Sequence, residues 1–206
     1  MLVLIDGAVQ GDALAIAQAA KALRYPVVEV PATQQPLPID GGAFQWGFVF
    51  GGEPSLTRYQ SLHSQAKEKN VALLNDVAQH AQARESDALA PLLEMNGQPL
   101  RRLEHLTRTW RLFVLDADVL AMGFVGAPSD VFGPLSEREQ RELSELAHRA
   151  ALATRVPWLA VDAAQLENGE WRVLETHAPG NCALGAIDPA HFVASLARAL
   201  DMRGGC

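Results

Sequence analysis

The first half of the chain alternates short apolar runs with segments of helical spacing. Runs of mostly apolar residues with the length of buried strands cover residues 2–5, 27–30, 46–50 and 71–74. Helical spacing separates the first run from the second and the third from the fourth. Strands that alternate with helices are typical of a parallel sheet covered on both faces. We therefore expect a small Rossmann-like α/β unit in the amino-terminal half.

In the second half, strand patterns come in pairs joined by tight turns. One pair of apolar runs flanks Asp116-Ala117, and a second pair flanks Asn168-Gly169. Asn-Gly is the dipeptide that best accommodates the two positive φ angles of a type I′ turn, and Asp-Ala is a weaker form of the same signal. Each pair therefore predicts an antiparallel hairpin, the first over residues 110–125 and the second over residues 158–176.

Two helices are expected beside these hairpins. Ser136 and Glu139 have the spacing of a capping box, and the apolar residues that follow have helical spacing as far as Val156. Asp188 and Pro189 are a typical start for a last helix. These patterns predict an antiparallel α+β subdomain after the parallel sheet. The predicted domains are a Rossmann-like unit over residues 1–80, a connecting segment over 81–109 and a carboxy-terminal subdomain over 110–206.

The turn at Asn168-Gly169 also predicts which residues face each other across the second hairpin. Side chains of directly paired residues lie on the same face of a sheet. We therefore expect Asp162, Glu175 and His177 on one face, and the opposite face against the capped helix. Counting outward from a two-residue turn gives the pairs Leu166 with Trp171, Asp162 with Glu175, and Ala160 with His177. The helix-covered face would then consist of Leu159, Val161, Ala163, Leu174 and Thr176.

Two carboxylates at directly paired positions repel each other unless something offsets their charge. A divalent cation is one offset, because Mg²⁺ takes oxygen ligands and often uses one or two carboxylates, with water or phosphate oxygens completing its shell. The alternative is an ion pair between one carboxylate and an arginine such as Arg111 or Arg172. The sequence leaves both interpretations of Asp162 and Glu175 open.

The composition favours a globular protein and argues against several classes of partner. The chain of 206 residues is 49% hydrophobic, enough to bury a core, and its formal net charge of −7 argues against binding to nucleic acid. It has no apolar stretch long enough to cross a bilayer and no secretory signal pattern, so we expect a cytoplasmic protein without a membrane partner. Cys182 and Cys206 lack metal-ligand spacing and are expected to be free thiols.

The order of these motifs resembles the ATP-grasp superfamily. The residues that carry the resemblance are the strand hairpin with Arg111, the capped helix, the apolar strand from Val156-Pro157-Trp158 to Asp162, the Asn-Gly hairpin, and Glu175-Thr176-His177 followed by Pro179-Gly180. The resemblance implies a pre-ATP-grasp domain over residues 1–76 and a carboxy-terminal ATP-grasp subdomain over residues 110–200. It also implies ATP and Mg²⁺ as cofactors, with Asp162 and Glu175 as the metal ligands. Arg111 would be the catalytic residue near the nucleotide phosphates or an acyl phosphate, and His177 would lie beside the bound cofactor.

Two features depart from the family pattern. The usual Glu-x-Asn is Glu175-Thr176-His177 here, and histidine is a poorer Mg²⁺ ligand than an amide oxygen, so either the metal differs or His177 lies outside its shell. The family's amino-terminal ATP-grasp subdomain, whose lysines hold the nucleotide phosphates, also lacks a counterpart. Residues 77–109 are too few for it and contain no lysine. The cations that remain to replace those lysines are Arg84, Arg101, Arg102 and Arg108.

These departures lead to two hypotheses about function. The first is a shortened ATP-grasp-like protein that acts as a non-catalytic or weakly active nucleotide-binding, metal-binding or interaction module, with a homodimer or a partner subunit completing the site. The second is an ATP- and Mg²⁺-dependent ligase that joins a small-molecule carboxylate to an amine or thiol through an acyl phosphate. A plain Rossmann-like reductase or transferase would need a glycine fingerprint that Gly7 and Gly11 do not match.

Overall fold

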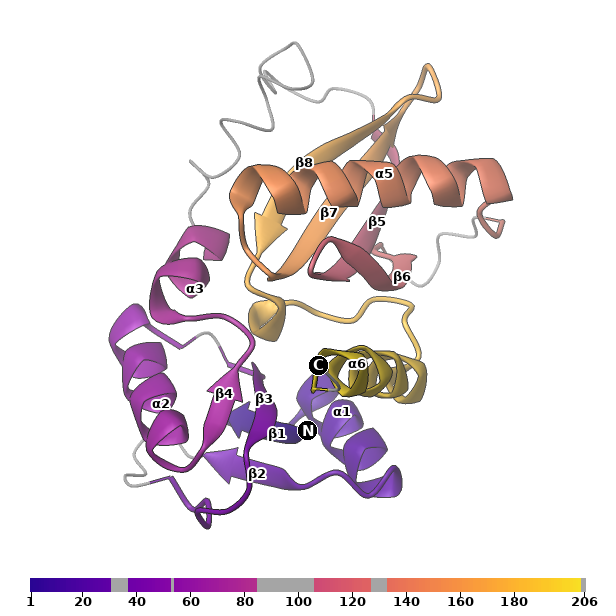
Figure 1. The fold of residues 1–206 in the computed structure, drawn as a ribbon. Helices are drawn as coiled ribbons and strands as arrows, with labels where there is room; N and C mark the ends of the chain where they lie inside the picture. Colours follow the sequence, from indigo (N-terminus) through magenta and orange to yellow (C-terminus); the bar gives the residue numbers. More distant parts are fainter. Residues whose placement is uncertain (31–36, 53, 85–105, 127–132, 205–206) are drawn as a thin grey trace. The chain divides into compact units, whose positions relative to one another are not determined.

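The computed structural model describes residues 1–30, 37–52, 54–84, 106–126 and 133–204 of the chain. The chain forms two compact units (Figure 1). The first unit contains residues 1–81, 179–183 and 188–206, and the second contains residues 82–178 and 184–187. The last helix, which the sequence-based boundaries placed in the second subdomain, therefore belongs to the first unit. Among the described residues, no helix is long and apolar enough to cross a membrane.

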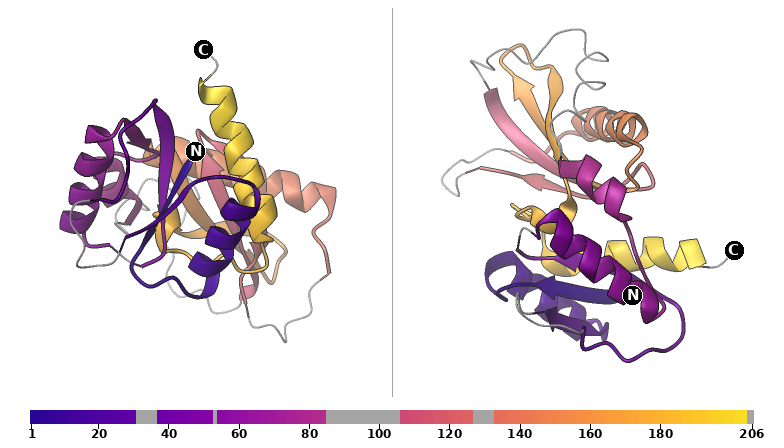
Figure 2. Two further views of the ribbon diagram at one scale, coloured as in Figure 1. Left: turned by 90° about the horizontal axis from the view of Figure 1, so that it is seen from below. Right: turned by 90° about the vertical axis from the view of Figure 1, so that its left-hand side faces the viewer.

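The first unit is built on a parallel sheet in the order β2-β1-β3-β4. Its strands are β1 (Leu2–Asp6), β2 (Val27–Val30), β3 (Gln45–Phe50) and β4 (Val71–Leu73). Helix α1 (Gly11–Ala22) connects β1 to β2, and helix α2 (Leu56–Glu68) connects β3 to β4 in the opposite direction along the sheet. Because such crossovers are right-handed, the two helices cover opposite faces of the sheet (Figure 2). The expected small Rossmann-like parallel sheet is confirmed.

Helix α6 (Pro189–Gly204) completes the first unit, where it packs beside α1. Phe192 of α6 is fully buried, and its ring lies edge-on to Phe48 and Phe50 of β3, with centroids 6.4 and 6.5 Å away. Asp188 caps the helix as the sequence predicts, since its Oδ2 accepts the backbone N–H of His191 at 2.8 Å. Helical spacing indicates that α6 has an apolar face, but it does not indicate which sheet that face covers. The short helix η2 (Pro179–Asn181) also belongs to this unit, and α3 (Val77–Arg84) leads from the first unit into the second.

The second unit is an antiparallel sheet in the order β6-β5-β7-β8, with one long helix along one face (Figure 2). The strands are β5 (Leu106–Leu115), β6 (Asp118–Phe124), β7 (Trp158–Leu166) and β8 (Trp171–His177), and the helix is α5 (Glu137–Thr154). Buried side chains of α5, such as Leu143 and Ala147, share a core with Leu112, Leu159 and Val161 of the strands. The expected antiparallel α+β arrangement is confirmed.

The local signals at the start of α5 and in the β5–β6 turn act as the sequence predicts. Ser136 accepts the backbone N–H of Glu139 at 3.3 Å, and Glu139 accepts the backbone N–H of Ser136 at 2.8 Å, which completes the capping box. Asp116 and Ala117 have φ angles of 51° and 71°, as a type I′ turn requires at both central positions. Both features depend on residues close together in the sequence, so they are readable without the tertiary structure.

Candidate functional site

The pairing of β7 with β8 positions the candidate site. Near the turn, Trp171 faces Gln165 and not Leu166, so the predicted register is wrong there. The cause is a three-residue loop: the backbone N–H of Leu166 donates to the carbonyl of Glu170 at 2.8 Å, and within the loop only Gly169 has a positive φ, 84°. The two-residue type I′ turn expected at Asn168-Gly169 is therefore wrong as well.

A β-bulge restores the predicted pairing at the far end of the hairpin. The register shifts between Asp162 and Ala163, so that Ala163 pairs with Val173 while Asp162 pairs with Glu175. Leu174 is the extra residue of β8, and this insertion cancels the offset that the longer loop creates. The pairs of Asp162 with Glu175 and of Ala160 with His177 are thus confirmed. The bulge also changes the helix-covered face, where Trp171 and Val173 join the core and the expected Leu174 does not.

Arg111 of β5 lies directly opposite Asp162 of β7. Its Nε and Nη2 donate to Oδ1 and Oδ2 of Asp162, each at 2.7 Å, so the guanidinium and the carboxylate form two parallel hydrogen bonds. Both side chains are buried. The ion pair that the sequence offered as an alternative to a metal site is therefore present with Arg111. Arg172 instead contacts Glu170, at 3.2 Å.

Glu175 and His177 lie beside this ion pair at the end of β8. The Nε2 atom of His177 is buried and lies 3.4 Å from Oδ2 of Asp162 and 3.4 Å from Oε1 of Glu175. One potential ligand atom from each of the three side chains lies within 4.8 Å of the others. The Glu175 side chain is 56% exposed, so the cluster is open to solvent on that side. The structure brings together Arg111, Asp162, Glu175 and His177, the four residues singled out from the sequence.

Charge interactions within the cluster shift two pKa values in opposite directions. Burial alone would raise the pKa of Asp162, but the hydrogen bonds from Arg111 and the neighbouring His177 outweigh burial and hold this pKa below its ordinary value. The Asp162 carboxylate raises the pKa of His177 against the opposing effect of burial, and Glu175 adds to the increase. Counting formal charges, Arg111 neutralises one of the two carboxylates, so the cluster carries a net charge of −1 when His177 is neutral.

The number and spacing of these ligand atoms fit a divalent cation. Two ligand atoms bound to one ion at about 2.1 Å each can be at most about 4.2 Å apart. Both 3.4 Å separations from His177 are within that limit, and the exposed Glu175 side chain is free to close on the third. Carboxylate oxygens are the ligands that Mg²⁺ prefers, whereas imidazole suits transition metals better. Asp162 and Glu175 therefore fit Mg²⁺, and His177 is the unusual member of the set.

The arginines expected to replace the family's lysines do not add a cation to this cluster. Arg108 contacts Glu139 of α5, donates to Oε1 of Gln165 at 2.8 Å and lies 5.1 Å over the ring of Trp171. These contacts tie β5 to α5 on the helix-covered side of the sheet. Arg84 closes α3, and positions 101 and 102 lie outside the described residues.

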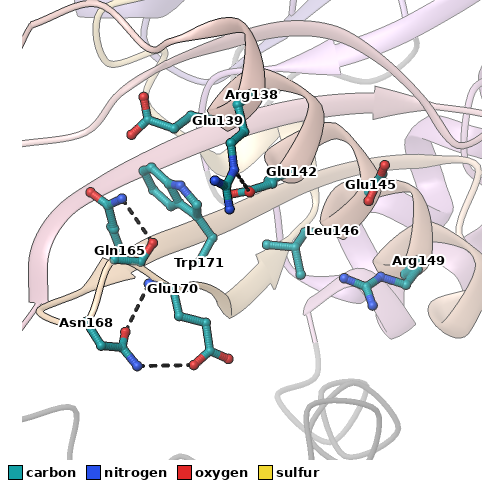
Figure 3. A pocket seen from close by; sticks show the side chains of 11 residues that line it. Arg138, Glu139, Glu142, Glu145, Leu146, Arg149, Gln165, Asn168, Glu170 and Trp171 are labelled. Atoms are coloured by element: carbon teal, nitrogen blue, oxygen red, sulfur yellow. Dashed lines mark hydrogen bonds and ion pairs between the residues drawn. The ribbon is translucent and has the colours of Figure 1, made fainter.

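A separate hollow lies beside α5, at the loop end of the β7–β8 hairpin (Figure 3). Its volume is about 810 Å³, and its lining includes Trp171 and several acidic residues of α5. Those acids already have partners, as Glu142 contacts Arg138 at 2.7 Å and Glu170 contacts Arg172 at 3.2 Å. The four residues of the cluster are not part of its lining. The sequence did not predict this hollow, because spacing along a strand does not show how far a hairpin extends beyond its covering helix.

The chain was compared with known families and structures. Residues 63–196 match a family model for the ATP-grasp domain, the third family of its clade, and no curated protein matches the chain. Similar solved structures include the ATP-grasp ligase PsnB complexed with minimal precursor, Mg and ADP, with a TM-score of 0.62, 13% identity and coverage of 96% of each chain. The D-cycloserine synthetase DcsG has a TM-score of 0.61 and 13% identity, with 97% of this chain and 99% of that chain covered. A RimK domain protein ATP-grasp from Sphaerobacter thermophilus DSM 20745 has a TM-score of 0.56 and 12% identity, with 98% and 96% covered. Identities this low establish a common fold and nothing about activity.

Proposed function

The chain belongs to the ATP-grasp family, and from that premise we propose that it is a nucleotide- and metal-binding ATP-grasp module with weak or no ligase turnover. The observation that carries the proposal is the convergence of Asp162, Glu175 and His177 beside the paired guanidinium of Arg111. In this proposal Asp162 and Glu175 hold Mg²⁺, and Arg111 contacts the nucleotide phosphates.

The charge balance of the cluster supports binding of a metal together with a phosphate. Without metal, the formal charge is −1, which attracts a cation; with a dication bound it becomes +1, which attracts an anion. A guanidinium has five N–H donors, and Asp162 takes two of those of Arg111. The same side chain can therefore hold the carboxylate in position and present a positive edge to a phosphate. Nucleotide phosphates would complete the coordination of the metal, as is usual for Mg²⁺.

The distribution of lysines supports weak or absent catalysis. Phosphoryl transfer depends almost entirely on positioning the phosphates and neutralising their charge. The only three lysines of the chain are Lys21, Lys67 and Lys69, so the sequence after Asn70 contains none. Arginine is a poor replacement, since its fixed fork and the point charge of an ammonium hold phosphate differently. A second subunit, either another copy or a different protein, would be needed to supply those contacts.

A carboxylate ligase that acts through an acyl phosphate is the second candidate. It is favoured by the fold, because similar structures include proteins named as a ligase and a synthetase. Under this proposal a small-molecule carboxylate takes the γ-phosphoryl group of ATP, with Arg111 beside the acyl phosphate, and an amine or thiol then displaces the phosphate. Both candidates use ATP and therefore suit a cytoplasmic protein.

The proposal is tested by calorimetric titration of ATP and ADP with Mg²⁺ into the full chain. The wild type should give saturable binding, and Glu175→Gln should weaken it by at least about tenfold, which is about 1.4 kcal/mol. Glu175 is the better position to change because it is exposed, whereas loss of Asp162 would leave Arg111 buried without its partner. Glu167→Gln, on the exposed loop of the same hairpin, is the matched control and should bind like the wild type.

Two results would contradict this proposal. No binding heat at millimolar nucleotide would remove the nucleotide-binding function. Rapid ADP formation that depends on an added carboxylate and amine would replace the weakly active module with the ligase.

A further inference from the structure

We infer that Nε2 of His177 is itself a ligand of the bound ion, so that this site prefers a transition-metal dication such as Mn²⁺ to Mg²⁺. The inference rests on the proposed metal site and names the class of ion that it takes. It starts from the one residue that departs from the Glu-x-Asn pattern of the family.

The position of Nε2 is what a ligand atom requires. This atom is buried, although the side chain as a whole is 30% exposed, and it lies 3.4 Å from an oxygen of each carboxylate. At that distance it makes no hydrogen bond of good geometry with either one. A buried ring nitrogen without a well-formed hydrogen bond is costly, because it has given up water without a full replacement. An ion between the three side chains would supply the missing interaction.

The backbone holds His177 in this position before any ion arrives. His177 is the last residue of β8, and its cross-strand partner is Ala160 of β7. The partner's side chain is a single methyl group, so it leaves space on this face for the imidazole ring. The bulge at Leu174 sets the facing of both Glu175 and His177. The three side chains therefore converge through strand pairing, and a bound ion would need little rearrangement of the chain.

The type of ligand decides which ion is preferred. Mg²⁺ favours oxygen ligands in near-ideal octahedral geometry, and an imidazole in its shell is unfavourable compared with an amide oxygen. Divalent transition metals accept imidazole readily, and Mn²⁺ also accepts carboxylates and water. Two carboxylates with one imidazole thus suit Mn²⁺ better than Mg²⁺. An asparagine at position 177 would return the site to oxygen ligands only.

The competing explanation is that His177 is protonated and bridges the two carboxylates. An imidazolium has no lone pair for a metal and would act as a cation itself. The two explanations predict opposite responses to metal, because a bridging imidazolium competes with the ion, whereas a neutral ligand binds it.

The test is a titration of Mn²⁺ into the nucleotide-free full chain at pH 8, followed by the electron paramagnetic resonance signal of free Mn²⁺, with Mg²⁺ as the competitor. The wild type should bind one Mn²⁺, with an affinity for Mn²⁺ at least about 100-fold higher than for Mg²⁺. His177→Asn should reduce this ratio by at least about tenfold. His148→Asn, an exposed histidine of α5 whose ring contacts only Ala117 among the hydrogen bonds of the described residues, is the matched control. Circular dichroism and the melting temperature establish that each variant folds, and His177→Gln is a second variant if the first does not.

A spectroscopic measurement adds a direct readout. Bound Mn²⁺ should show the magnetic coupling of an imidazole nitrogen in the wild type and in His148→Asn, and lose it in His177→Asn. A wild type that binds no Mn²⁺, or a Mn²⁺/Mg²⁺ ratio that His177→Asn leaves unchanged, would overturn the inference. These outcomes are separate from the proposed function: nucleotide can bind with Mg²⁺ in a site without Mn²⁺ preference, and Mn²⁺ can bind in a protein that takes no nucleotide.

Discussion

Each of the two units contains a buried pair of arginine and aspartate, and the two pairs differ in what surrounds them. In the first unit, Nε and Nη2 of Arg58 both donate to Oδ1 of Asp6, at 3.1 and 2.9 Å. In the second unit, Arg111 donates to both oxygens of Asp162 at 2.7 Å. The same residue types thus form a one-oxygen contact in one unit and a two-oxygen contact in the other.

The difference follows from where the backbone places each pair. Asp6 ends β1 and Arg58 lies in the first turn of α2, so their contact ties a strand to a helix in the Rossmann-like unit. Arg111 and Asp162 are directly paired residues of neighbouring antiparallel strands, which aligns the fork with the carboxylate. Next to the second pair lie Glu175 and His177, which offer further ligand atoms. A buried ion pair is therefore weak evidence of function, and the residues beside it distinguish a candidate site from a structural contact.

The largest expected effect separates the two pairs by removing one carboxylate from each. Asp162→Ala and Asp6→Ala should each destabilise their own unit by about 3–5 kcal/mol, because a buried arginine is left without its partner. Only Asp162→Ala should also abolish Mn²⁺ binding. Hydrogen exchange followed on peptides of β1–β4 and of β5–β8 measures each unit separately. Loss of Mn²⁺ binding in Asp6→Ala would mean that the ion does not bind where we place it.

A smaller difference is expected when each arginine becomes lysine. An ammonium can replace a contact with one oxygen better than a fork that spans two. Arg111→Lys should therefore cost about 2 kcal/mol and Arg58→Lys about 1 kcal/mol, in the order expected for lost charge-assisted hydrogen bonds. Urea unfolding with the same exchange readout gives both values. Equal costs would show that the two-oxygen geometry contributes nothing extra.

The smallest effect is a pH dependence that belongs to the second unit alone. The neighbouring Asp162 raises the pKa of His177 in the folded state, so its contribution to stability is complete below the unfolded value of about 6.5 and is lost as pH rises through the folded pKa. In the absence of metal, the wild type should therefore lose stability relative to His177→Asn between pH 6 and pH 8. We expect less than about 1 kcal/mol, as for other partly exposed ion pairs. Melting temperatures measured with a chelator test this, and an opposite trend would contradict the shift.

The predictions from sequence succeeded where a short segment carries its own geometry. The capping box of Ser136 and Glu139 and the turn at Asp116-Ala117 form as expected, because each depends on a few adjacent residues. The hairpin at Asn168-Gly169 is different. Its two-residue turn was wrong, and the pairing of Asp162 with Glu175 was nevertheless right because the bulge at Leu174 compensates. The correct pairing therefore came partly from two errors that cancel.

The sequence by itself determined the alternating and paired strands, the identity of the four residues of the cluster and the missing lysines, since these are properties of local pattern and composition. Only the tertiary structure decided that Asp162 is held by Arg111, that the β7–β8 loop has three residues, and that α6 covers the sheet of the first unit. These features depend on contacts between segments far apart in the chain. Local pattern states that a side chain is apolar or charged, whereas packing determines which distant partner it meets.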